Sequence, residues 1–425
     1  MIPGAMPPAV VLVLPKSGYR NDDFLAAAKR LGAEVIVASD VCHQLADEWA
    51  AAPVALRFRD AQAAADELAR AVRERKPMAV IGVDDLTALV ATLTSARLRL
   101  PHNPAEAVAA ARSKALSRAK MRDADVAVPR FEVASRDIGG DDLEALLQRA
   151  PYPCVVKPLV LSGSRGVIRA DDPQALRAAL KRVAALLSSP DVAQRRDADL
   201  ERVLIEEFVP GPEVALEGLL MRGHLHALAI FDKPDPLDGP YFEETIYVTP
   251  SRHPAPLQDA IAREVSRGCA ALGLAEGPVH AELRLSPSGP RILEIAARSI
   301  GGLCGRALRF GVGVTLEELI LRHALGMTGD PPPREKRASG VVMLPIRRRG
   351  VLEEVRGVEE ARHVPLVEDV AITAHLREEL VPLPEGASYL GFAFARGDTP
   401  EQVEQALRHA AARIEAVVTP RLSVT

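Results

Sequence analysis

Cysteine is scarce in this sequence of 425 residues, and the four cysteines lie far apart, at Cys42, Cys154, Cys269 and Cys304. They form no CxxC pair and no Cys/His spacing, so the sequence predicts neither a disulfide framework nor a zinc site. A reducing, cytoplasmic setting is the simplest expectation from this cysteine usage.

The sequence also lacks a dense run of one charge and a long apolar segment. The formal net charge is −4, and no Lys/Arg stripe of the kind that binds nucleic-acid phosphates is present. The first apolar run is only a few residues long and has no basic leader, so it is too short for a signal peptide or a membrane span. We therefore expect neither a nucleic-acid nor a membrane partner.

At this length two or three domains are expected. Strand patterns at 9–15, 33–39 and 78–85 alternate with helical patterns such as 61–75, which predicts a parallel α/β N-terminal domain over residues 1–104. No GxGxxG follows the first strand, so an NAD-dependent oxidoreductase is disfavoured. The remaining pattern predicts an α+β region of two lobes, a proline-rich linker and a small α+β C-terminal domain, over residues 105–328, 329–340 and 341–425.

Residues 277–302, GPVHAELRLSPSGPRILEIAARSIGG, are two alternating strands joined by a turn rich in proline and glycine. If Leu285 pairs with Arg291 across the five-residue loop SPSGP, Glu282 lies directly opposite Glu294. The residues expected on the same face as the two glutamates are His280, Ala296 and Arg298. The residues expected to face the core are Ala281, Leu283, Leu293, Ile295 and Ala297.

Two carboxylates directly opposite one another repel, so this pair needs compensation. A shared proton is one solution. A divalent cation such as Mg²⁺, held by the two carboxylates with water and phosphate oxygens, is another. The third is a solvated strand face on which Arg284 screens the two acids. The hairpin alone leaves these alternatives open.

Three upstream stretches carry further candidates. Lys157 lies inside an apolar strand, where an unpaired charge is costly. Either an anion binds its ammonium group or the side chain extends to solvent at the strand end. The loop SGSRGV at 162–167 follows it, and its glycines let backbone NH groups approach phosphates, although such loops are often plain turns. EEFVPGPEV at 206–214 has the pattern of an ordinary hairpin, and Lys114 that of a solvated helix lysine.

Taken in order, these stretches resemble the ATP-grasp superfamily of carboxylate ligases. SKALSRAKMRDADVAVP resembles its opening helix, VVKPLVLSGSRGV its second lysine and flexible loop, EEFVPGPEV its adenine hinge, and HAELRL with RILEIAAR its metal hairpin. The ending EIAARSIGG and the upstream FDKPDPLDGPYFEETIYVTPSR are more similar to the bacterial L-amino-acid ligases that form dipeptides. The resemblance implies that region 105–328 is the ATP-grasp domain, with the nucleotide between its lobes.

The resemblance implies ATP and Mg²⁺ or Mn²⁺ as cofactors, and it assigns nucleotide-binding roles. The residues expected at the phosphates are Lys114 and Lys157, under a loop containing Gly163, Ser164 and Gly166. Those expected at the adenine and ribose are Glu206, Glu213 and the backbones of Glu207 and Val209.

The metal ligands implied by the resemblance are Glu282 and Glu294, and Arg298 is expected to contact the transferring phosphate. Many relatives have Asn at the position of Ala296, so here ATP oxygens and water would complete the metal coordination. His280 is expected either to orient an acyl phosphate or to fill a polar niche. Gly301 and Gly302 either bind a substrate oxygen through their NH groups or form a turn.

The implied reaction joins a small carboxylic acid, such as an amino acid, to an amine, with release of ADP and phosphate. The residues suggested for the amine are Tyr241, Glu243 and Glu244, since an ammonium needs an acidic or aromatic partner. Rival functions are a bicarbonate-using carboxylase and a nucleotide-binding regulatory protein without turnover. A homodimer is expected from the superfamily resemblance.

Overall fold

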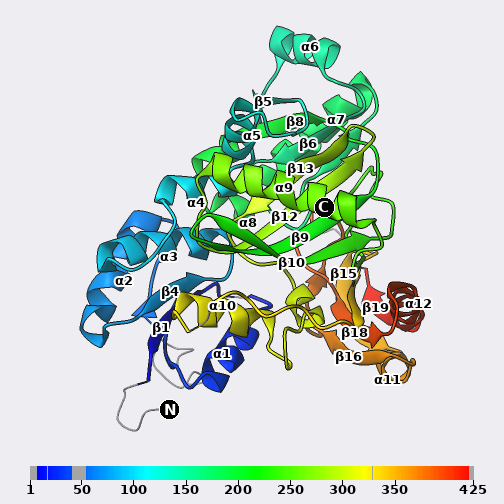
Figure 1. Ribbon diagram of the computed structural model, residues 1–425. Coiled ribbons are helices and arrows are strands. Elements are labelled where there is room, and N and C mark those ends of the chain that lie inside the picture. The colour runs from blue at the N-terminus through cyan, green and yellow to red at the C-terminus, as the bar shows by residue number, and fades with distance from the viewer. Residues whose placement is uncertain (1–6, 17, 41–53, 328, 421–425) are drawn as a thin grey trace.

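The computed structural model describes residues 7–16, 18–40, 54–327 and 329–420. Cys42 and the outermost residues of the predicted first and last domains lie outside these ranges. Figure 1 shows the N-terminal region, the cyan and green lobe and the orange C-terminal region grouped around a central sheet. No helix in the described ranges is long and apolar enough to cross a membrane.

The N-terminal lobe contains the predicted parallel sheet, in the order β3-β2-β1-β4. The strands are β1 (Ala9–Leu14), β2 (Glu34–Ser39), β3 (Val54–Ala55) and β4 (Ala79–Gly82). The helices are α1 (Asn21–Arg30), α2 (Ala61–Val72), the 3-10 turn η2 (Arg73–Arg75) and α3 (Asp85–Leu98). The Asp84 side chain caps α3 by accepting a hydrogen bond from Thr87 N at 2.7 Å. This cap fixes Asp85 at the carboxyl end of β4.

A smaller antiparallel sheet forms the next lobe, in the order β5-β8-β6-β7. Its strands are β5 (Phe131–Ser135), β6 (Cys154–Pro158), β7 (Ile168–Ala170) and β8 (Arg202–Glu207). The helices of this region are α4 (Ala105–Arg112), α5 (Lys114–Asp123), α6 (Gly140–Arg149), α7 (Pro173–Leu187), α8 (Pro190–Ala193) and the 3-10 turn η3 (Ala198–Glu201). Leucines of α6 and α7 pack on the sheet to form one core. The extended residue Ser113 separates α4 from α5, so Lys114 begins a helix.

The large sheet has eight strands, in the order β13-β12-β9-β10-β11-β14-β18-β16. They are β9 (Glu213–Met221), β10 (His224–Lys233), β11 (Ile246–Thr249), β12 (Gly277–Ser286), β13 (Gly289–Ala296), β14 (Ala338–Leu344), β16 (Val367–Ile372) and β18 (Gly391–Gly397). The helices α9 (Ala255–Leu272) and α10 (Leu316–Ala324) and the 3-10 turn η4 (Cys304–Ala307) pack against it.

The C-terminal region adds a three-stranded sheet, β17-β15-β19. Its elements are β15 (Gly350–Arg356), β17 (Glu379–Leu380), β19 (Glu415–Thr419), α11 (Val358–Arg362) and α12 (Pro400–Ala411). The pairing of β11 with β14 makes the central sheet continuous between region 105–328 and the C-terminal region. The linker predicted at 329–340 was therefore too long, because Ala338–Gly340 already belong to β14. The other domain limits stay predictions.

The hairpin of β12 and β13 places Glu282 opposite Glu294, as the sequence predicted, but the residues nearer the turn are paired differently. Leu285 pairs with Pro290 rather than with Arg291, so the assumed turn was wrong by one residue. A β-bulge between Glu282 and Leu283 takes up this shift and restores the expected pairing at the glutamates. The bulge also turns Leu293 toward the cavity, whereas the sequence assigned it to the core.

Residues 208–212 are not an ordinary hairpin turn. They carry the chain from β8 in the small sheet to β9 in the large sheet. Gly211 has φ +115°, and a Cβ there would lie 2.2 Å from the Leu285 carbonyl oxygen. This crossing therefore joins the two lobes at the edge of the site described next.

Candidate functional site

One cavity of about 490 Å³ is lined by all the regions described above. The N-terminal lobe contributes Arg20 and Asp85, the small sheet Lys157, and the C-terminal region Tyr389. Of the predicted site residues, Gly166, Tyr241 and Glu243 do not line the cavity. Those that do are Lys114, Lys157, Gly163, Ser164, Glu206, Glu207, Val209, Glu213, Glu244, His280, Glu282, Glu294, Arg298, Gly301 and Gly302.

The two predicted phosphate-binding lysines are paired with carboxylates across the cavity. Lys114 donates a hydrogen bond to the Leu161 carbonyl at 2.8 Å and lies 3.4 Å from Glu294 Oε2. It is buried, so it is not a solvated helix lysine. Lys157 contacts Glu206 directly. Both ammonium groups therefore have anionic partners that a triphosphate could replace.

Glu206 is held from both sides. Arg118 donates to its Oε2 at 3.1 Å, and Lys157 contacts Oε1. Burial alone would raise the pKa of Glu206, but the charges of Arg118 and Lys157 keep it below its usual value. Arg118, which is fully buried and also donates to the Leu293 carbonyl, was not predicted from the sequence.

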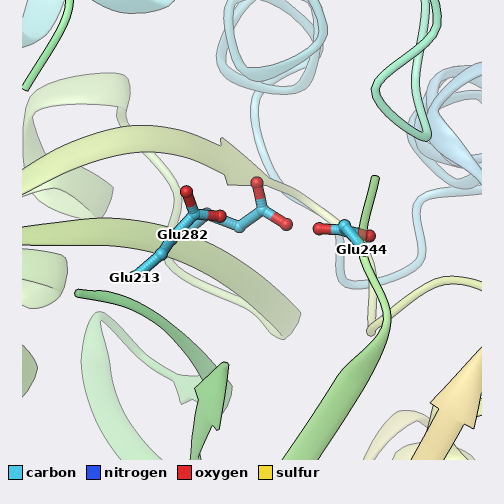
Figure 2. A group of neighbouring side chains, drawn as sticks. All are labelled: Glu213, Glu244 and Glu282. Carbon is cyan, nitrogen blue, oxygen red and sulfur yellow. The ribbon is translucent and has the colours of Figure 1, made fainter. Parts of the chain in front are cut away.

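A second carboxylate cluster consists of Glu213, Glu244 and Glu282, each with an oxygen within 4.8 Å of the others (Figure 2). The ammonium of Lys233 lies among them, at 2.6, 2.7 and 3.1 Å respectively. Burial would lower the pKa of Lys233, but the three carboxylates raise it well above its usual value. Lys233 was missed, although a charge ending an apolar strand is the same signal that singled out Lys157.

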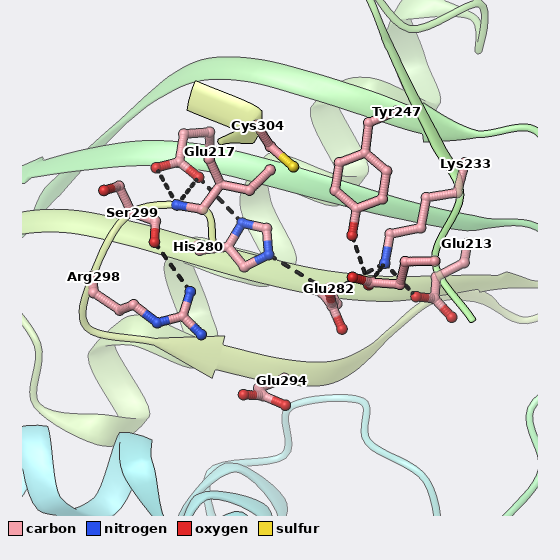
Figure 3. A network of polar contacts seen from close by, with 12 residues as sticks. Glu213, Glu217, Lys233, Tyr247, His280, Glu282, Glu294, Arg298, Ser299 and Cys304 are labelled. Atoms are coloured by element: carbon pink, nitrogen blue, oxygen red, sulfur yellow. Dashed lines mark hydrogen bonds and ion pairs between the residues drawn. The ribbon is translucent and has the colours of Figure 1, made fainter. Parts of the chain in front are cut away.

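His280 links Glu282 to a carboxylate that the sequence analysis did not identify. Its Nδ1 lies 3.1 Å from Glu217 Oε2, and its Nε2 lies 3.6 Å from Glu282 Oε1 (Figure 3). Burial would lower the pKa of His280, but hydrogen bonding to Glu217 and Glu282 raises it to about 9. Glu217 also accepts hydrogen bonds from Ile300 N at 3.0 and 3.1 Å. This contact fixes the start of the segment that contains Gly301 and Gly302.

Arg298 reaches into the cavity from the end of β13 and pairs with Asp85 of the N-terminal lobe. Its Nε lies 3.1 Å from Asp85 Oδ1, and its Nη1 donates to the Ser299 carbonyl at 3.0 Å. Burial would raise the pKa of Asp85, but the Arg298 guanidinium holds it below its usual value. Asp85 was read only as the end of a strand, because nothing in the sequence shows which residue it meets.

The glycine loop is attached to the C-terminal region. Gly166 N donates to the Pro384 carbonyl at 2.8 Å, and Arg165 Nε donates to the Glu385 carbonyl at 2.8 Å. The Glu385 side chain pairs with Arg182 of α7 at 2.5 Å. Segment 382–387 is therefore in contact with both the loop and the helix that follows it.

Replacing Glu385 with alanine is expected to loosen this attachment. The pair with Arg182 is partly exposed, so its loss costs about 1 kcal/mol or less, and hydrogen exchange at the Gly166 amide should become up to about five-fold faster. Glu144→Ala removes a comparable exposed pair, Glu144 with Arg177 at 2.7 Å, from the same helix. Equal acceleration in both variants would contradict a specific link between segment 382–387 and the loop.

Two residues suggested for amine binding lie elsewhere. Tyr241 is outside the cavity lining, and its ring packs against Arg182 at 5.0 Å. Glu243 faces a small adjacent hollow near Leu383 rather than the main cavity. Neither residue therefore faces the main cavity, and Tyr241 instead forms an isolated β-bridge with Ile168. Glu244 stays in the cavity, where Tyr247 donates to it at 2.6 Å.

Comparison with known protein families identifies two segments of the chain. Residues 150–307 match the ATP-grasp domain, and residues 342–419 match the L-amino acid ligase C-terminal domain 2. The chain therefore contains an ATP-grasp domain followed by an L-amino acid ligase C-terminal domain 2. The matched ATP-grasp segment includes Lys157, the glycine loop, the crossing at 208–212 and the hairpin of β12 and β13.

The chain is similar to an L-amino acid ligase from Bacillus licheniformis, with TM-score 0.78 and 24% identity, covering 98% of this chain and 100% of that one. It is 34% identical over 179 residues to carnosine synthase 1 of Gallus gallus, covering 39% of this chain and 19% of that protein. It is 28% identical over 202 residues to dapdiamide A synthase of Enterobacter agglomerans, covering 47% and 45%. The chain thus spans less than half the length of these two curated relatives.

Proposed function

We propose that this ATP-grasp protein joins a small carboxylic acid to an amine through an acyl phosphate, with release of ADP and phosphate. One observation carries the proposal: a single cavity is lined by the paired glutamates Glu282 and Glu294 and by three cations, Lys114, Lys157 and Arg298. Two names among the relatives, L-amino acid ligase and dapdiamide A synthase, support an amide-forming reaction.

In this proposal Lys114 and Lys157 bind the phosphates of ATP in exchange for their present partners, Glu294 and Glu206. That exchange frees Glu294 for a metal ion. Glu206 and the backbones of Glu207 and Val209, at the crossing between the lobes, bind the adenine, and Glu213 binds the ribose. Gly163, Ser164 and Gly166 belong to the loop that covers the phosphates; Gly163 has φ +64° and Ser164 φ +55°, conformations in which successive NH groups can face an anion.

The residues around the hairpin fit a divalent metal. Glu282 and Glu294 offer the hard carboxylate oxygens that Mg²⁺ and Mn²⁺ prefer. Lys233 and Lys114 at present neutralise these same side chains at 3.1 and 3.4 Å, which accounts for how like charges are tolerated opposite one another. A metal held by Glu282 and Glu294 would supply charge neutralisation at the phosphate oxygens of ATP.

The proposed chemistry has two steps. A carboxylate oxygen of the substrate attacks the γ-phosphorus, the bond to the bridging oxygen breaks, and ADP leaves. The amine nitrogen then attacks the acyl carbon, phosphate leaves with the electron pair of the C–O bond, and the nitrogen loses a proton. Arg298 stabilises the negative charge that develops in both steps, and the loop excludes water from the acyl phosphate. His280 orients the phosphate, with Glu217 fixing its ring.

Hydroxylamine trapping tests this proposal. The protein is incubated with ATP, Mg²⁺, hydroxylamine and each of the twenty amino acids in turn, and ADP, AMP and hydroxamate are measured. We expect equal amounts of ADP and hydroxamate with one or a few donors, and no hydroxamate when ATP is omitted. AMP as the product would contradict an acyl phosphate. ADP release that depends on bicarbonate would favour the carboxylase, and no release with any donor would favour the regulatory alternative.

A further inference from the structure

Arg182 is a surface arginine of α7 that joins two segments far apart in the sequence. Its Nε and Nη2 donate to the Glu385 carboxylate at 2.5 and 2.9 Å, and its Nη1 donates to the Tyr241 hydroxyl. Tyr241 belongs to segment 234–245, which connects β10 to β11, and Glu385 belongs to segment 382–387, between β17 and β18. The planar guanidinium therefore uses each of its three nitrogens to hold one residue of each segment.

Three irregular stretches line the cavity, and together they are called the cover here: the glycine loop at 162–167, segment 234–245 and segment 382–387. Among the residues with which they line the cavity are Ser164, Phe242 and Ala387. Stretches without regular backbone pairing have low local stability, so their positions depend on a small number of side-chain and backbone contacts. The contacts that Arg182 makes are of this kind.

Each of the two segments also contacts the backbone at the end of the glycine loop or just after it. Gly166 N donates to the Pro384 carbonyl at 2.8 Å, and Arg169 N donates to the Pro240 carbonyl at 2.9 Å. In the described ranges, no hydrogen bond or ion pair joins the two segments to one another directly. Arg182 therefore closes a ring of contacts around the end of the loop.

Each segment keeps other neighbours, so Arg182 governs how the two move relative to one another. Arg408 of α12 binds Asp235 at 2.6 Å. The pKa of Glu385 lies below its usual value, mainly because of the hydrogen bond from Arg182, and the charge of Arg349 acts in the same direction. Loss of Arg182 would therefore free neither segment from the protein, but it would remove the contact that joins them.

We propose that Arg182 is a positioning residue that makes the cover open and close as one unit, which keeps water from the acyl phosphate until the amine attacks. This inference rests on the proposed function. In an incompletely closed cavity a water oxygen attacks the acyl carbon, the bond from that carbon to the phosphate oxygen breaks, and phosphate leaves with the electron pair while the water loses its protons. The acid is regenerated and no amide forms. Arg182 lies outside the cavity lining, so it acts on this competition between amine and water without touching the reacting atoms.

The test separates formation of the acyl phosphate from its loss to water. With a donor found by hydroxylamine trapping, ADP release is measured without any amine and again with saturating hydroxylamine. Arg182→Gln should release ADP without amine about 3- to 10-fold faster than wild type, because exposed charged contacts favour a local closed state by a factor of that order. ADP release with saturating hydroxylamine follows formation of the acyl phosphate, so it should stay within about three-fold of wild type. A purely structural defect would lower both rates.

Residue-resolved hydrogen exchange tests the coupling without any substrate. The Gly166 and Arg169 amides report on the two segments, since each donates to a carbonyl of one of them. Arg182→Gln should accelerate exchange at both amides by about 3- to 10-fold. Tyr241→Phe removes only the hydroxyl that Arg182 binds, and it should accelerate exchange at Gly166 by about two-fold, although Tyr241 lies in the other segment.

Arg177→Gln is the matched control. Arg177 lies on the same helix, pairs with Glu144 at 2.7 Å and has a side chain that is 49% exposed, against 43% for Arg182. The same chemical change at this position removes an ion pair that does not involve the cover. Both ADP rates and exchange at both amides should therefore stay as in wild type.

Three results would overturn the proposal. The first is an unchanged rate of ADP release without amine in Arg182→Gln. The second is an equal loss of both ADP rates in that variant, which would make Arg182 a structural residue. The third is acceleration confined to Arg169 in Tyr241→Phe, which would mean that the two segments move separately. If wild type forms no hydroxamate at all, the proposed function itself fails, and the exchange measurements still decide whether the cover moves as one unit.

Discussion

Replacing Glu294 with glutamine is expected to lower kcat for ADP formation by about 1000-fold or more, because the amide cannot supply the negative charge that holds a divalent metal. The side chain is partly exposed, at 26%, and its ion pair with Lys114 is long, at 3.4 Å. Stability should therefore change by only about 1 kcal/mol or less. The measurement is ADP release over a Mg²⁺ titration, with thermal unfolding to confirm that the variant is folded.

Glu276→Gln is the matched control. Glu276 precedes β12 on the same hairpin chain, its side chain is 30% exposed, and it lies 3.4 Å from His323 Nε2, outside the cavity lining. Neutralising it removes one carboxylate from the same region without touching the proposed metal site. Near-normal turnover of Glu294→Gln at ordinary Mg²⁺ concentrations would remove Glu294 from the proposed metal ligands.

The hairpin shows why local patterns predicted part of this site. Alternation of apolar and acidic residues predicted that Glu282 and Glu294 share a face, and they do lie opposite one another. The bulge that makes this possible was not predictable, because Leu293 is as apolar as its neighbours and its position in the cavity wall depends on the tighter turn. The parallel N-terminal sheet was predictable for a similar reason: fully buried strands have continuous apolar runs.

The residues that the sequence did not reveal meet partners from distant segments. Asp85 pairs with Arg298 across 213 positions, and Arg118 donates to the Leu293 carbonyl across 175. Neither has a local pattern that marks it, since an aspartate at a helix start and an arginine in a helix are common on surfaces. Lys233 is different. It ends an apolar strand, so the cost of burying a charge could have identified it before its three carboxylate partners were known.

Replacing Arg298 with alanine is expected to slow the chemical step by about 1000-fold while changing ATP affinity by less than about three-fold. In the proposed function its charge is needed when negative charge develops on the transferring phosphate, whereas the lysines and the crossing segment would bind most of the ATP molecule. Single-turnover ADP formation and nucleotide titration measure the two quantities separately. A defect confined to ATP affinity would contradict this role.

Asp85 decides how that variant must be interpreted. Without Arg298, Asp85 is left as an unpaired carboxylate in the cavity wall, which is destabilising by itself. The double variant Arg298→Ala, Asp85→Asn removes both charges, so it should recover stability but stay inactive. Asp85→Asn alone keeps the guanidinium and loses only its orientation, so kcat should fall by about 10- to 30-fold with KM for ATP unchanged. Recovery of activity in the double variant would mean that Arg298 only neutralises Asp85, and the catalytic assignment would then be wrong.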